Sequence, residues 1–175
     1  MSRRFFTMAG ILAICLATPC LAQQTGTPRL AEKWRPSAAD LGLFNVAHEL
    51  TKIETRFLRY GLEFRDYANA IDPAEIDRLL LLQNEAFRAC DLLDAVAIAL
   101  LGYVHISEVS ARADFRTLID KRLADSIKRL NMAVSAVNHS SNTKSAAIAA
   151  SAAHMGDDLR EAKTLLESIR LPQTQ

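Results

Sequence analysis

The chain has 175 residues, half of them hydrophobic, and its 21 basic and 20 acidic residues give a formal net charge of +1. A chain of this length can bury a core in one domain without disulfides or metals to stabilise it. The near balance of charge gives no reason to expect nucleic acid or an anionic membrane surface as the main partner.

The first 22 residues have the three parts of a secretory signal. Arg3 and Arg4 provide the charged start, an apolar run from Phe5 to Leu16 follows, and Ala22 is a small residue at the expected cleavage point. The run is shorter than the ~20 residues that span a membrane. We therefore expect residues 1–22 to be removed, and the mature protein to be periplasmic or secreted.

The signal also partly matches the twin-arginine export motif. Ser2, the two arginines and Phe5-Phe6 resemble its first half, but Thr7-Met8 replace the Leu-Lys that completes it. We expect the general secretory (Sec) route rather than the twin-arginine route. Cleavage also removes two of the three cysteines, so Cys90 would have no partner for an intramolecular disulfide.

The first helix is predicted after an irregular lead-in of residues 23–37, which contains Gly and Pro and shows no periodicity. Ser37 and Asp40 have the spacing of a capping box, and apolar residues then recur at steps of three and four as far as Ile71. Asp72 and Pro73 predict the end of this helix and the cap and first residue of the next.

Three more helices follow in the same predicted domain, which spans residues 38–171. The second runs from about 73 to 106, and from Leu92 to Val104 it carries only one charge, Asp94, so it is apolar around most of its circumference. Ser107–Ser110 predicts a turn, the third helix ends near Asn138, and the fourth ends at Leu171-Pro172.

Four long helices with short connections predict an all-α fold. The expected architecture is an antiparallel four-helix bundle with up-down-up-down topology, or helical hairpins paired in a dimer. The second helix is acidic and the third is basic, which weakly favours their adjacency.

Sequence motifs that carry catalysis or hold a metal are absent. His48-Glu49 begins like the His-Glu-x-x-His motif of zinc proteases, but Lys52 stands where the second histidine is needed. None of the four histidines has a glutamate three residues before it, which excludes the two-metal carboxylate bundle. We therefore expect no metal, no cofactor and no enzymatic activity.

The first functional hypothesis is an interaction module, such as an envelope adaptor, an assembly component, a chaperone or an inhibitor. Its partner would be another envelope or secreted protein, or a second copy of the chain. An apolar helix segment too short to cross a bilayer is either covered within the bundle or left for a partner. The predicted interaction face consists of Leu92, Leu93, Val96, Leu100, Tyr103 and Val104.

The second hypothesis is a small-ligand-binding bundle with an aromatic-lined pocket. Its pocket residues would be Phe57, Tyr60, Phe64, Tyr67 and His105. The same aromatic residues could equally be core, with the tyrosine hydroxyls at its edge. Cys90 lies in an apolar seam and is expected to pack as a small hydrophobic residue.

Overall fold

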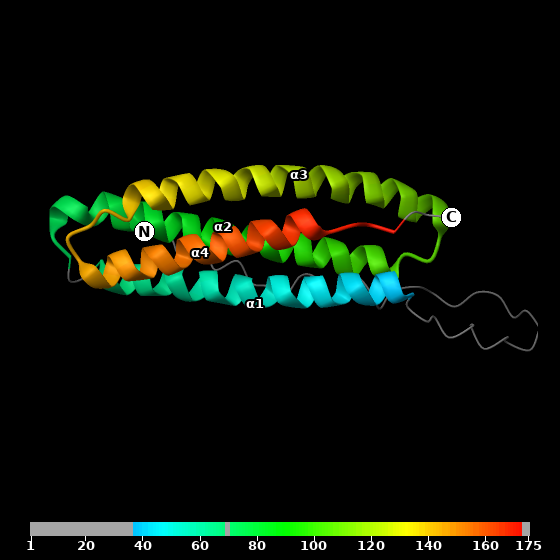
Figure 1. Cartoon of the computed structure of the whole chain (residues 1–175), viewed down its shortest axis with the longest axis horizontal. Coiled ribbons are helices and arrows are strands. Elements are labelled where there is room, and N and C mark those ends of the chain that lie inside the picture. Colours follow the sequence, from blue (N-terminus) through cyan, green and yellow to red (C-terminus); the bar gives the residue numbers. More distant parts are fainter. Residues whose placement is uncertain (1–36, 69–70, 173–175) are drawn as a thin grey trace, which may run out of the picture. The chain divides into compact units, whose positions relative to one another are not determined.

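The computed structural model describes residues 37–68 and 71–172, and these residues form helices and no strands. The helices are α1 (Ala38–Tyr67), α2 (Ile76–His105), α3 (Val109–Ser140) and α4 (Ala146–Ser168), and a short 3-10 helix, η2 (Pro73–Glu75), precedes α2 (Figure 1). The predicted all-α fold is confirmed. The predicted signal (1–22) and nearly all of the lead-in (23–36) lie outside the described residues.

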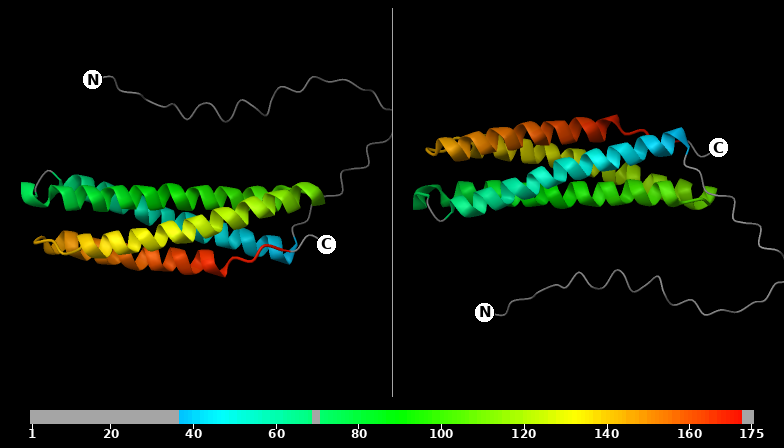
Figure 2. Two further views of the ribbon diagram at one scale, coloured as in Figure 1. Left: turned by 90° about the horizontal axis from the view of Figure 1, so that it is seen from above. Right: turned by 90° about the horizontal axis from the view of Figure 1, so that it is seen from below.

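Consecutive helices run side by side in opposite directions, as the three ribbon views show (Figures 1 and 2). Both α1 and α3 pack against α2 and α4. The result is the predicted up-down-up-down bundle, and the helices of one chain complete it. The predicted adjacency of α2 and α3 is also confirmed.

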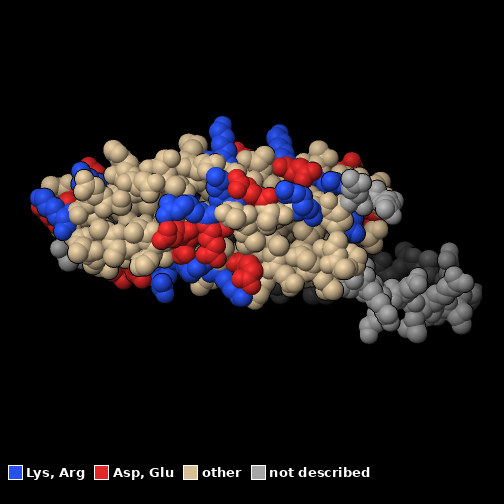
Figure 3. Space-filling view, in the orientation of Figure 1, with Lys and Arg blue, Asp and Glu red and all other residues tan. Residues whose placement is uncertain are grey.

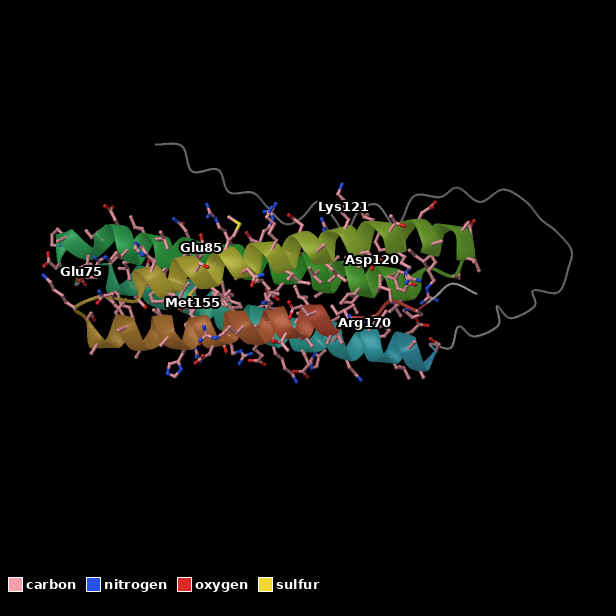
Figure 4. The ribbon with its side chains drawn as sticks, turned by 45° about the horizontal axis from the view of Figure 1, so that its top comes forward. Glu75, Glu85, Asp120, Lys121, Met155 and Arg170 are labelled. Atoms are coloured by element: carbon pink, nitrogen blue, oxygen red, sulfur yellow. The ribbon has the colours of Figure 1, made fainter. Side chains whose placement is uncertain are left out.

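The two pairs of helices that face each other diagonally across the bundle differ in how closely they pack. Helices α2 and α4 contact each other across the centre, and α2 therefore touches all three of the other helices. Buried residues of α4 include the small Ala152 and Gly156, and a Cβ atom added to Gly156 would lie 3.8 Å from Val137 of α3. Met155, the large α4 side chain beside them, lies between the helices (Figure 4) and is fully buried, as are Phe57 of α1 and Leu93 of α2.

Local signals set the start of the first two helical segments as predicted. The Ser37 hydroxyl accepts a hydrogen bond of 3.1 Å from the Asp40 backbone N–H, and the Asp40 carboxylate accepts one of 3.1 Å from the Ser37 backbone N–H. Asp72 caps the following segment, with Pro73 at its first position. That segment opens as the 3-10 turn η2, and α1 ends at Tyr67, before the predicted limit.

The fourth helix is shorter than predicted, because it ends at Ser168 instead of Leu171. Ile169 has an extended conformation, and both Ile169 and Leu171 are buried. The Pro172 carbonyl accepts hydrogen bonds of 3.1 Å from the Tyr103 hydroxyl and 3.3 Å from the Arg116 guanidinium. Leu171 precedes a proline, where helical backbone is disfavoured.

Gly61 of α1 packs directly against the Phe87 ring of α2. A Cβ atom added to this glycine would lie 2.7 Å from Cε1 of the Phe87 ring. The ring therefore occupies the space that any larger residue would need. The α1–α2 interface is the most extensive in the bundle.

Polar contacts join segments at each end of the bundle. One end carries the buried Glu75 (Figure 4). Its carboxylate accepts hydrogen bonds from the Thr143 hydroxyl (2.7 Å) and the Lys144 backbone N–H (2.9 Å). At the other end, Arg112 of α3 forms an ion pair with Asp40, and its guanidinium carbon lies 4.6 Å from the Tyr103 ring centroid.

Candidate interaction groove

The predicted interaction face on α2 is almost entirely inside the bundle. Leu93, Val96, Leu100, Tyr103 and Val104 are buried in the core, and Leu92 alone is partly exposed. The proposal that these six residues form a surface for a partner is therefore corrected. The physical reason is that α2 touches all three other helices, so most of its apolar circumference is used within the fold, while Ile98 of the same segment remains 61% exposed.

The aromatic pocket is corrected as well. Phe57, Tyr60 and Phe64 are buried in the core, and Tyr67 packs against its edge. His105 instead lies beside Phe44, with ring centroids 5.9 Å apart. Phe44 and Tyr67 lie near opposite ends of α1, separated by roughly 34 Å at 1.5 Å per residue. These five residues therefore do not meet in one site.

Tyr60 belongs to a polar network between α1 and α4. Its hydroxyl donates a hydrogen bond of 2.9 Å to Asp158, whose carboxylate also pairs with Arg56 at 3.0 Å. Arg56 reaches Glu161 of α4 at 2.7 Å as well. Burial, reinforced by the hydrogen bond to the Asp158 carboxylate, raises the pKa of Tyr60 to about 12. Charged groups of both signs also mark the middle of the α1–α4 face (Figure 3).

This α1–α4 network borders a surface hollow of about 490 Å³. Arg59, the other arginine at the hollow, faces Glu63 at 3.4 Å. The acidic and basic groups thus neutralise one another, and we interpret the network as a device that aligns the two helices.

Cys90 packs at the α1–α2 interface as expected from its apolar seam. Its thiol is buried, and Sγ lies 3.6 Å from the Glu54 carboxylate. Burial, together with the nearby negative charge of Glu54, raises the pKa of Cys90 to about 11. A thiol that remains protonated is a poor nucleophile, so this position does not suit redox or covalent chemistry.

The larger hollow is a groove of about 790 Å³ between α2 and α3. Leu92, Ala95 and Ala136 are partly exposed in its lining, and Met132 is 65% exposed beside them. The other lining residues are Glu85, Arg88, Ala89, Asp91, Arg122, Asp125, Ser126, Lys128, Arg129, Leu130 and Ala133. Many lining residues are small, so the surface between the two helices is hollow and partly apolar.

Ion pairs at the groove stay within one helix. Arg88 pairs with Glu85 of α2 at 2.8 Å, and Arg129 pairs with Asp125 of α3 at 2.7 Å. Within residues 37–68 and 71–172, no ion pair joins α2 to α3. Helices α2 and α3 thus have opposite net charges and lie side by side, but no ion pair of the described residues joins them directly.

Among the described residues, no group of three or more His, Cys, Asp or Glu side chains is placed to hold a metal ion. In the same part of the chain, no helix is both long and apolar enough to cross a membrane. Comparison with known proteins adds no identity: no protein-family model, curated protein sequence or solved structure significantly matches this chain.

The sequence interpretation found one groove residue, Leu92, and missed those on α3. The sequence does contain a signal for the α3 side of the groove. Met132 interrupts the polar face of the third helix and falls outside the apolar seam that runs through Leu130 and Val134. Such an exposed, flexible apolar side chain is typical of binding surfaces. The concave shape could not be predicted, since it depends on how α3 rests against α2.

Proposed function

We propose that this chain is an exported, non-catalytic helical bundle that acts by binding another protein through the groove between α2 and α3. The observation that carries the proposal is the groove itself, which is open to solvent and exposes Leu92 and Met132 between two helices. A concave apolar strip flanked by polar residues is a typical docking surface for a partner. The N-terminal signal pattern supports export to the periplasm or the medium.

The groove supports protein binding better than small-ligand binding. Ligand pockets bury most of the surface of their ligand. Arg88, Arg122 and Met132 are exposed around this groove, so a small molecule lying in it would remain largely in water. The core holds three aromatic side chains of the alternative pocket, Phe57, Tyr60 and Phe64, and His105 lies apart from them beside Phe44.

The proposal can be tested by site-specific photo-cross-linking in the cells that produce the protein. A photoreactive phenylalanine analogue is placed at Met132, or at Leu58, which is exposed on α1 and serves as the matched control. We expect a discrete protein adduct in the envelope or secreted fraction from position 132 and none from position 58.

Two outcomes would contradict the proposal. One is the absence of any position-132 adduct. The other is native mass spectrometry of the protein from its own cells that shows a bound molecule of a few hundred daltons and no associated polypeptide.

A further inference from the structure

Basic side chains on the α3 side of the groove lack acidic partners. Arg122 and Lys128 are exposed in the lining, and no carboxylate of the described residues lies within 4.0 Å of either. The neighbouring Arg129 is neutralised by Asp125. On the α2 side, Asp91 likewise has no ion-pair partner in this part of the chain. The groove thus presents two unpaired basic groups on one wall and one unpaired acid on the other.

The groove also has a length that suits a short helix. On α2 its lining extends from Glu85 to Ala95, and on α3 from Arg122 to Ala136. At 1.5 Å per residue these spans correspond to about 15 and 21 Å, or three to four helical turns. The apolar strip between the walls matches the stripe that an amphipathic helix presents.

Resting on the function proposed above, we propose that the groove binds an amphipathic helix of another protein whose α3-facing flank is acidic. Apolar side chains of the partner would lie over Leu92 and beside Met132. Its carboxylates would face Arg122 and Lys128. Such complementarity adds to association rate and to choice of partner.

Other occupants fit these observations less well. The lead-in of this chain is basic, with Arg29, Lys33 and Arg35 against Glu32, so it would be repelled from α3. A second copy that placed the same groove against itself would set two concave surfaces face to face, and neither would be filled. An anionic membrane is too flat for a concave site and would meet the acidic Asp91 wall.

The test uses purified protein and two labelled peptides of about 14 residues, the helix length set by the groove. Both carry the same leucine stripe, with glutamate on the flank in one and lysine in the other. We expect the glutamate peptide to bind at least ~10-fold more tightly, with the difference falling at high salt. Equal binding of the two peptides, or binding of neither, would overturn the inference.

A matched pair of variants locates the effect. Arg122→Glu should weaken binding of the glutamate peptide by ~5-fold or more. Lys121→Glu is the same change one residue earlier, outside the groove lining, and should change the affinity for this peptide by less than ~2-fold. Figure 4 shows Lys121 pointing away from the bundle. Both positions are exposed, so both variants should retain the wild-type circular-dichroism melt.

Equal losses of peptide affinity in Arg122→Glu and Lys121→Glu would contradict the placement of the peptide in the groove. Binding to phosphatidylglycerol vesicles that is lost in Arg122→Glu would assign the surface to a membrane instead. If position 132 gives an adduct but the two peptides bind equally, this inference alone would be overturned. If position 132 gives no adduct, the proposed function itself would be overturned.

Discussion

At the scale of single residues, local and distant contacts differ in how far they can be predicted. The hydrogen bonds between Ser37 and Asp40 follow from a three-residue spacing, and the sequence predicts them. The hydrogen bond from Tyr60 to Asp158 joins two helices that are far apart in the chain. No spacing rule links those two residues, because their meeting depends on the register of α4 against α1.

The Tyr60 hydroxyl gives a stability prediction. Tyr60→Phe removes a buried hydrogen bond to a charged group, and we expect it to lower the free energy of unfolding by about 1–3 kcal/mol at neutral pH. Tyr67→Phe on the same helix, at a partly exposed position, should have little effect. Urea unfolding of the two variants measures this difference.

The raised pKa of Tyr60 adds a pH dependence to the same experiment. Folding holds the phenol protonated, so this stabilisation is complete below pH 10, the ordinary pKa of tyrosine, and is lost as pH rises through about 12. The difference between wild type and Tyr60→Phe should therefore shrink in strong alkali. A difference independent of pH across that range would contradict the assignment.

At the scale of helices, periodicity predicted the number and order of the elements, whereas packing determined their ends and the role of α2. The apolar circumference of residues 92–104 predicts a surface that is covered within the bundle or left for a partner. Most of it packs within the bundle instead, because α2 contacts α1, α3 and, across the diagonal, α4, and Ile98 alone of its large apolar side chains is exposed. A single helix cannot reveal how many neighbours it has. The early end of α4 at Ser168 has a similar cause, since burial of Ile169 and Leu171 depends on the neighbouring helices.

The contact between Gly61 and Phe87 gives a prediction at this scale. Gly61→Ala should improve helix propensity by about 1 kcal/mol, but overpacking against the ring should cost about 1–3 kcal/mol. We expect net destabilisation in the wild-type background and stabilisation in the Phe87→Ala background. Urea unfolding of the four proteins in this double-mutant cycle measures the coupling, and additive effects would show that the ring does not restrict this position.

At the scale of the whole bundle, the contacts of Glu75 hold the connection before α2 to the connection before α4. Hydrogen bonds from the Lys144 backbone N–H and the Thr143 hydroxyl lower the pKa of Glu75 below its ordinary value of 4.5. Nothing in the sequence marks Glu75 as more than a first-turn acid, since its partners lie in another loop. Asp40 has the equivalent position at the opposite end, where it meets Arg112.

Replacing the Glu75 carboxylate should weaken the bundle in a pH-dependent way. Glu75→Gln keeps the shape of the side chain but turns one acceptor oxygen into a donor, and we expect a lower urea midpoint at neutral pH. Because the folded pKa is lowered, the contribution of wild-type Glu75 is present above pH 4.5 and is lost as pH falls through the folded pKa. The two proteins should become more alike as the pH falls below 4.5, while Glu167→Gln, an exposed control, should match wild type throughout.

The short connections of the bundle also bear on how quickly it can assemble. Each helix packs against the next one along the chain, and the most extensive interface, α1 with α2, joins the first two. Contacts between segments close in sequence have a small loop-closure cost, and such topologies fold fast. The first hairpin can therefore form before the chain is complete. The surface between α2 and α3 arises only when α3 packs against α2, so any partner of that surface meets helices that have already docked.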